Sequence, residues 1–224
     1  MRSFRVLAHL LAYPEAELQT HMGELKTALT DEGLLKGKPL KNLLGFMDEF
    51  AAMDIILAQE QYVDLFDRGR AHCLHLFEHV HGESRFRGQA MIELAERYKT
   101  KGIEIGTGEL PDYLPLMLEF ISITGADEGL DLLEQAAPVI ATIGEKLKRQ
   151  KSGYAHIMNA IVTLSGANIS KADIQKAADA ALPDIKSLDE LDEQWKEPEA
   201  FTGAPDCGTC DPDETPSPQL NGGM

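Results

Sequence analysis

Apolar residues recur three or four positions apart along most of the chain, with polar residues between them. In a helix of 3.6 residues per turn these positions fall on one face, so the pattern predicts amphipathic helices that pack on a common core. No alternating strand pattern competes with it. In the first half of the chain the apolar positions are Phe4, Leu7, Leu10, Leu11, then Leu40, Leu43, Leu44, Met47, Phe50, then Ile55, Ala58, Tyr62, Leu65, Phe66, then Cys73, Leu76, Phe77, Val80, and then Met91, Leu94, Ala95, Tyr98.

The second half of the chain continues the helical pattern. Asp112 is expected to cap a helix that carries Pro115 in its first turn, where proline is tolerated. This helix is apolar nearly all round, which predicts a central, buried position. Gly102 is expected to end the helix before it, and a long helix containing Pro138 is expected from about Asp127. Two shorter helices follow, with apolar positions at Tyr154, Ile157, Met158, Ile161, Val162 and at Ile174, Ala177, Ala178, Ala181.

The composition changes near Asp184. From there to residue 224 the chain holds eleven acidic residues against two lysines, together with five prolines. Such a segment cannot bury enough apolar surface to offset the entropy lost on ordering it. We therefore expect a single all-α domain over residues 1–183 and a mostly disordered acidic tail over residues 184–224, in which Trp195 and Phe201 are aromatic exceptions.

The formal net charge of −16 argues against nucleic acid as a partner, because phosphates are neutralised by Lys and Arg and no basic stripe is visible. A cationic partner is favoured instead, although much of the acidity belongs to the tail. No apolar run is long enough to span a bilayer, and no signal peptide is recognisable, so a cytoplasmic location is expected. Three cysteines agree with a reducing compartment.

Two groups of residues could carry metal or redox chemistry. His72, His75 and His79 are expected on one helical stripe, where imidazoles three and four residues apart can share a metal ion. The stripe lacks a carboxylate motif such as H-E-x-x-H, so boundary histidines are the favoured interpretation. Cys207 and Cys210 have the spacing of half a zinc site, but their acidic neighbours disfavour the thiolate. No phosphate loop or nucleophile motif is present, and no enzymatic activity is expected.

Two long motifs resemble a known family. They run through Tyr62-Val63, Phe66-Asp67-Arg68-Gly69-Arg70, Leu76-Phe77-Glu78-His79-Val80-His81-Gly82, Arg85 and Arg87-Gly88-Gln89-Ala90-Met91, and then through Glu109-Leu110-Pro111-Asp112-Tyr113-Leu114-Pro115-Leu116. Both resemble the signatures of the NarJ-type assembly chaperones of nitrate reductase, in the TorD, DmsD and NarJ superfamily. His72, His75 and Tyr113 depart from the pattern expected of the family.

The resemblance implies a TorD-like helical bundle without a stably bound cofactor. It implies a partner, the catalytic (alpha) subunit of a respiratory nitrate reductase, whose N-terminal segment the chaperone binds until the molybdenum cofactor is inserted. That cofactor belongs to the client enzyme. Direct insertion of the chaperone into the membrane is not expected.

A binding site for the client peptide is predicted where the 66–88 and 109–120 segments converge. An amphipathic helix could lay its apolar face in a groove and meet acidic groups at the rim. The predicted floor is Phe77, Met91, Leu114, Met117 and Phe120, and the predicted rim is Asp67, Glu78, Glu109, Asp112 and Glu119. The other predicted site residues are Arg70, His79, Gly82, Arg85, Gly88, Pro111 and Tyr113. For the floor, the alternative is that these five residues are ordinary core.

Two other functions remain open from the sequence. One is a chaperone for a molybdoenzyme exported by the twin-arginine route, which belongs to the same superfamily. The other is a small helical protein that binds metal or senses redox state through its histidines and its Cys-x-x-Cys pair.

Overall fold

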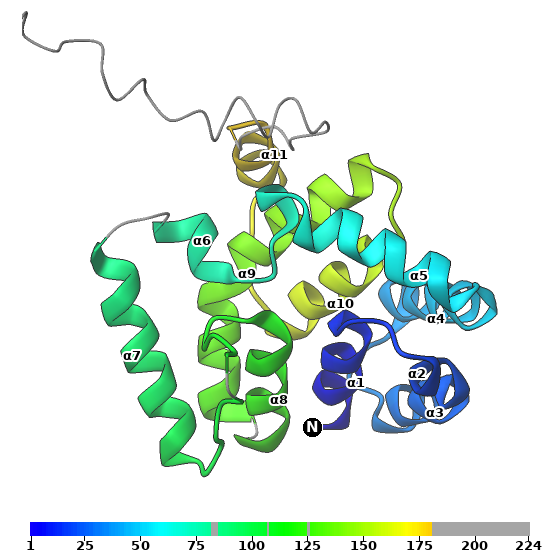
Figure 1. Ribbon diagram of the computed structural model, residues 1–224, viewed down its shortest axis with the longest axis horizontal. Coiled ribbons are helices and arrows are strands. Elements are labelled where there is room, and N and C mark those ends of the chain that lie inside the picture. Colours follow the sequence, from blue (N-terminus) through cyan, green and yellow to red (C-terminus); the bar gives the residue numbers. More distant parts are fainter. Residues whose placement is uncertain (82–84, 107, 125, 181–224) are drawn as a thin grey trace, which may run out of the picture. The chain divides into compact units, whose positions relative to one another are not determined.

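The structure is a computed structural model that describes residues 1–81, 85–106, 108–124 and 126–180 (Figure 1). All of these residues lie in the first of two compact units of the chain, Met1–Ile185. Gly82 and the acidic tail predicted over residues 184–224, with Cys207 and Cys210, lie outside the described residues. The predictions for the tail therefore stay predictions.

Helices account for every regular element of the described residues, which confirms the all-α prediction. None of these helices is both long and apolar enough to cross a membrane. In chain order the elements are α1 (Arg2–Leu11), α2 (Ala16–Thr20), α3 (Met22–Glu32), α4 (Gly37–Ala52), α5 (Ile55–Tyr62), the π-helix η1 (Val63–Asp67), the 3₁₀-helix η2 (Arg70–His72), α6 (Leu76–His81), α7 (Arg85–Thr100), α8 (Leu114–Thr124), α9 (Ala126–Arg149), α10 (Ala155–Ser165) and α11 (Lys171–Ala180).

Helix α8 lies at the centre of the packing, as its apolar sequence predicts. It contacts α1 on one side and α9 on another, and these neighbours are visible around it in Figure 1. Its buried residues belong to the same core cluster as the apolar face of α1. This burial supplies most of the stability of a helix whose length alone would leave it marginal in water. The buried residues of α8 are Leu114, Pro115, Met117, Leu118, Phe120 and Ile121.

Helix α7 ends as the sequence predicts. Gly102 has a φ of +75°, a left-handed conformation that glycine adopts without steric cost. Its amide donates to the carbonyl of Lys99 at 3.0 Å, and the amide of Ile103 donates to the carbonyl of Tyr98 at 3.1 Å. These two bonds form a Schellman motif, which satisfies the last carbonyls of the helix.

The prediction that His72, His75 and His79 share one helical stripe is wrong. His72 ends the short helix η2, His75 lies in an extended segment, and His79 lies in α6. The helix is interrupted at Cys73, whose ψ of 132° is extended rather than helical. The segment after it pairs with another part of the chain, and that tertiary contact overrides the helical periodicity.

Candidate functional site

The two motifs meet in a short antiparallel bridge between His75 and Tyr113. The amide of Leu76 donates to the carbonyl of Asp112 at 3.1 Å, and the amide of Leu114 donates to the carbonyl of Leu74 at 2.9 Å. Leu76 is the first residue of α6 and Leu114 is the first residue of α8. The bridge thus satisfies one N–H group at the start of each helix, and it confirms the predicted convergence of the two segments.

Asp112 is a buried residue of this bridge, with an exposed fraction of 0%. Its Oδ2 accepts a hydrogen bond from the amide of Phe77 at 3.0 Å, and its Oδ1 lies 3.3 Å from Nδ1 of His75. Phe77 is the second residue of α6, so Asp112 caps that helix from a distant part of the chain. The predictions that Asp112 stands at an exposed rim and caps the helix that follows it are therefore wrong. Pairing of the two segments directs its side chain inward, toward α6.

His75 is the electrostatic partner of Asp112. The hydrogen bond to Asp112 raises the pKa of the imidazole, against an opposing effect of burial, and the carboxylates of Glu78 and Glu109 raise it further. A protonated His75 would place a positive charge beside the buried side chain of Asp112. Burial of this side chain is tolerated because the Phe77 amide and the His75 imidazole form hydrogen bonds with its two oxygens.

A chain of hydroxyl groups joins the bridge to the end of α1. The hydroxyl of Tyr62 donates to the carbonyl of Leu11 at 2.9 Å, and the hydroxyl of Tyr113 lies 3.3 Å from that of Tyr62. Because the Tyr62 proton is used for Leu11, the Tyr113 hydroxyl is the donor between the two rings. On the other side of the bridge the Tyr98 hydroxyl donates to the carbonyl of Pro111 at 2.9 Å, which fixes α7 to the 109–113 segment.

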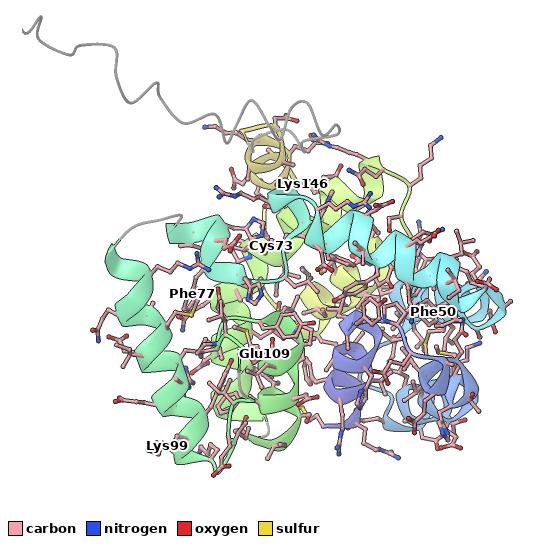
Figure 2. All side chains as sticks on the ribbon, viewed as in Figure 1. Phe50, Cys73, Phe77, Lys99, Glu109 and Lys146 are labelled. Atoms are coloured by element: carbon pink, nitrogen blue, oxygen red, sulfur yellow. The ribbon has the colours of Figure 1, made fainter. Side chains whose placement is uncertain are left out.

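Three residues of the predicted groove floor belong to the closed core. Leu114, Met117 and Phe120 are at most 1% exposed, so they line no open surface in this structure. Their position on α8 faces α1 and α9, and the alternative interpretation as core residues holds for them. Phe77 and Met91 differ, because both are only partly buried. Figure 2 shows Phe77 on α6, beside α7.

Carboxylates surround the bridge on its accessible side. Asp67 and Glu109 are exposed and Glu78 is partly buried. Their charges reach the bridge, since Asp67 and Glu109 contribute to raising the pKa of the Tyr113 hydroxyl, after the larger effect of burial. Glu78 is partly neutralised by Arg87, whose guanidinium lies 3.3 Å away. We refer to Asp67, Glu78 and Glu109 as the acidic rim.

The other predicted site residues occupy varied environments. Arg70 and Gly88 are exposed, and Glu119 is exposed on α8. His79 donates from Nε2 to the carbonyl of Cys73 at 2.8 Å, and burial lowers the pKa of its imidazole. Arg85 is the first residue of α7, but its side chain lies outside the described part of the structure.

Three residues of this site were not recognised from the sequence. His75 was expected in a metal or boundary stripe, and Tyr98 was expected only as an apolar position of a helix. Tyr62 was expected as an apolar position and as the start of the first motif, without a role for its hydroxyl. For the tyrosines a signal existed, since a buried Tyr hydroxyl usually finds a hydrogen-bond partner. No sequence signal identifies which carbonyl a Tyr hydroxyl meets.

The described residues give little support to thiol or metal chemistry. Burial raises the pKa of the Cys73 thiol to about 11, so this thiol stays protonated near neutral pH. Within the described ranges, no group of three or more His, Cys, Asp or Glu residues is arranged to hold a metal ion.

Comparison with known proteins decides the family. Residues 14–159, which include both motifs and the bridge, match the model of the nitrate reductase delta subunit family. The chain belongs to this family. The resemblance predicted from the two motifs is thereby confirmed.

Relatives from two bacteria show how far the similarity extends. The nitrate reductase molybdenum cofactor assembly chaperone NarJ of Escherichia coli (strain K12) is 37% identical over 205 residues, which cover 91% of this chain and 86% of that protein. The "probable nitrate reductase molybdenum cofactor assembly chaperone NarW" of the same strain is 34% identical, over 88% of this chain and 82% of its own. The protein named NarJ in Bacillus subtilis (strain 168) is 28% identical over 71% of this chain and 86% of its own.

Proposed function

We propose that this protein is an assembly chaperone for a respiratory nitrate reductase. It binds the N-terminal segment of the catalytic subunit, keeps that subunit available until the molybdenum cofactor has been inserted, and then leaves. The names of the E. coli relatives and their similarity over most of the chain support this function. The observation that supports the location of the binding site is the His75–Tyr113 bridge, because it joins the two family motifs beside the acidic rim.

The client surface consists of the acidic rim together with Phe77 and Met91. Partly buried apolar side chains next to carboxylates suit an amphipathic helix with basic residues along its polar face. The apolar contacts supply affinity, and the carboxylates supply orientation and a faster encounter. Exposed charge pairs contribute only ~0.2–1 kcal/mol each, so binding remains weak enough for release.

In this proposal the chaperone carries out no chemical step itself. The molybdenum cofactor belongs to the client enzyme, and the chaperone acts in the cytoplasm before the enzyme attaches to the membrane. The hydrogen-bonded bridge, with the buried Asp112 beside it, supports the binding surface, while the exposed acids make the contacts.

Calorimetric titration tests this proposal. The titrant is a synthetic peptide with the sequence of the first residues of the nitrate reductase catalytic subunit from the same organism, and titrations are run at low and high ionic strength. Glu109→Gln and Asp67→Asn remove charge from the acidic rim without removing a buried contact. Each is expected to weaken binding about twofold to fivefold at low salt and less at high salt. Asp31→Asn changes an exposed carboxylate of α3 and serves as the matched control.

The outcomes separate the function from the site. If the parent protein does not bind the peptide at either ionic strength, the chaperone proposal in this form is wrong. If the parent binds but Glu109→Gln and Asp67→Asn behave like Asp31→Asn, the function stands and the acidic rim is not its site.

A further inference from the structure

A groove lies between four helices, apart from the His75–Tyr113 bridge. Helices α4, α9, α10 and α11 enclose a volume of about 610 Å³ that is open to solvent. Helix α10 packs against both α9 and α4, and α11 packs against α9, so the groove runs along elements whose mutual contacts are fixed. Its apolar lining residues are Pro39, Ala141, Ala155, Met158, Val162 and Ile174.

Gly144 shapes the floor of this groove. A Cβ atom added there would lie 2.9 Å from the Cβ of Met158, so α9 and α10 approach each other closely only because this side chain is missing. Val162 of α10 and Ile174 of α11 are partly buried and line the groove. An apolar channel bounded by helices is a common way to receive a segment of another protein.

The charge at the edges of the groove is positive. Lys38, Lys148 and Lys171 line it from three different helices and all three are exposed. Glu145 is the acid among its lining residues, and that carboxylate already lies 3.0 Å from Lys148 and 3.8 Å from Arg149. A positive, apolar groove stands out in a chain whose formal net charge is −16.

The start of α4 adds to the positive potential. This helix begins beside Lys38, its N-cap residue Lys36 makes no side-chain capping bond, and its first turn contains no acid. The positive end of the helix dipole is therefore not neutralised by the helix's own sequence. This contribution reinforces the lysines and does not stand alone.

We infer that this groove binds a carboxylate-bearing amphipathic segment of a partner protein. Apolar side chains of the segment would cover the partly buried Pro39, Val162 and Ile174, and its carboxylates would pair with the lysines at the edges. The chemistry is opposite to that proposed for the basic client peptide, so the chain carries two surfaces that select different segments. An anionic bilayer is a poorer match, because the surface is concave and a protein of net charge −16 is repelled by it.

The test uses the full chain and two labelled probe peptides. Both are amphipathic helices with leucines on one face; one carries glutamates on the other face and the second carries lysines. Fluorescence anisotropy is expected to show that the glutamate peptide binds at the groove, whereas the lysine peptide suits the acidic rim and should bind independently of the groove. Lys38→Glu and Lys171→Glu should each weaken binding of the glutamate peptide about threefold to tenfold, because each replaces an attraction by a repulsion.

The control variant is Lys99→Glu, which changes an exposed lysine near the end of α7, far from the groove (Figure 2). It should leave the affinity unchanged, and so should Glu109→Gln, because the inference does not depend on the client surface. No binding of the glutamate peptide by the parent protein, or an unchanged affinity for it in both Lys38→Glu and Lys171→Glu, would overturn the inference.

Two further results would also overturn it in favour of another occupant. One is flotation of the parent protein with phosphatidylglycerol vesicles, lost in Lys171→Glu, together with no binding of the glutamate peptide. The other is a dimer of the parent protein in sedimentation velocity that dissociates in Lys171→Glu, which would assign the groove to a second copy of the chain.

Discussion

Asp112 caps helix α6 through the amide of Phe77, although the two residues are separated by 35 positions in the sequence. The distance from Oδ2 of Asp112 to the amide nitrogen of Phe77 is 3.0 Å, and the carboxylate is fully buried. Phe77 also lies on the proposed client surface. The orientation of that surface therefore depends on a buried residue that no client peptide can reach.

Replacement of Asp112 tests this dependence. Asp112→Ala removes the carboxylate oxygen that accepts the hydrogen bond of the Phe77 amide at the start of α6, and we expect a loss of ~1–3 kcal/mol in the free energy of unfolding. Asp112→Asn keeps an acceptor oxygen and should lose less. Urea denaturation of both variants measures the difference. Equal stability of Asp112→Ala and the parent would show that the cap contributes nothing.

The His75–Asp112 pair makes stability depend on pH. The hydrogen bond between His75 and Asp112 raises the pKa of His75 in the folded protein above the ordinary value of 6.5. A raised pKa in the folded state means that the pair contributes its full stability below pH 6.5, and that this contribution is lost as the pH rises through the folded pKa.

The measurement compares the parent with His75→Gln from about pH 5.5 to about pH 8.5. The loss of unfolding free energy in the variant should be largest at the acidic end and shrink as the pH rises. His79, whose pKa burial lowers, has the opposite pH dependence but is present in both proteins, so its effect cancels. His9→Gln changes an exposed histidine of α1 and provides the control. A difference that grows with pH would contradict the proposed pair.

The hydroxyl chain from Tyr113 through Tyr62 to Leu11 can be measured with a double-mutant cycle. Tyr62→Phe removes the donor from a buried carbonyl and should lower the free energy of unfolding by ~1 kcal/mol. Tyr113→Phe should cost less, because its hydroxyl is only partly buried. The two effects should not add, because the removal of Tyr62 also removes the acceptor of Tyr113. Strict additivity would show that the two hydroxyl groups do not interact.

Gly153 allows the chain between α9 and α10 to pass close to Phe46. A Cβ atom at position 153 would clash with Cδ2 of Phe46, whose ring packs against Tyr154 with centroids 5.2 Å apart. Gly153→Ala must displace that ring, and we expect a loss of ~1–3 kcal/mol in a thermal or urea unfolding experiment.

Gly45→Ala is the matched control for Gly153. Gly45 lies inside α4, and a Cβ atom there would meet nothing within 4 Å. Alanine is the better helix former, so this variant should gain ~0.5–1 kcal/mol. A similar change of stability in Gly153→Ala and Gly45→Ala would mean that the contact with Phe46 is not restrictive.

The amino-acid sequence by itself determined the helical class and most of the core. The apolar spacing of residues 4–11 and 154–162 predicts one buried face each, and the nearly all-apolar segment 114–121 predicts a buried helix, because helical periodicity and the cost of exposing apolar surface act along a short piece of chain. The prediction that α7 ends at Gly102 was equally local, since it depends on the backbone conformation of that glycine. The two motifs that resemble the nitrate reductase delta subunit family were also readable in the sequence.

Only the tertiary structure decided the arrangement of the site. Cys73 to His75 carry a helical pattern, yet they lie in no helix, because His75 pairs with Tyr113 and the carbonyl of Leu74 accepts from the amide of Leu114. The same pairing buries Asp112, which the sequence predicts at an exposed rim, and it assigns His75 to a carboxylate rather than to a histidine stripe. Periodicity specifies which face of a segment is apolar, but the partner of a polar group is fixed by contacts between residues far apart in the chain.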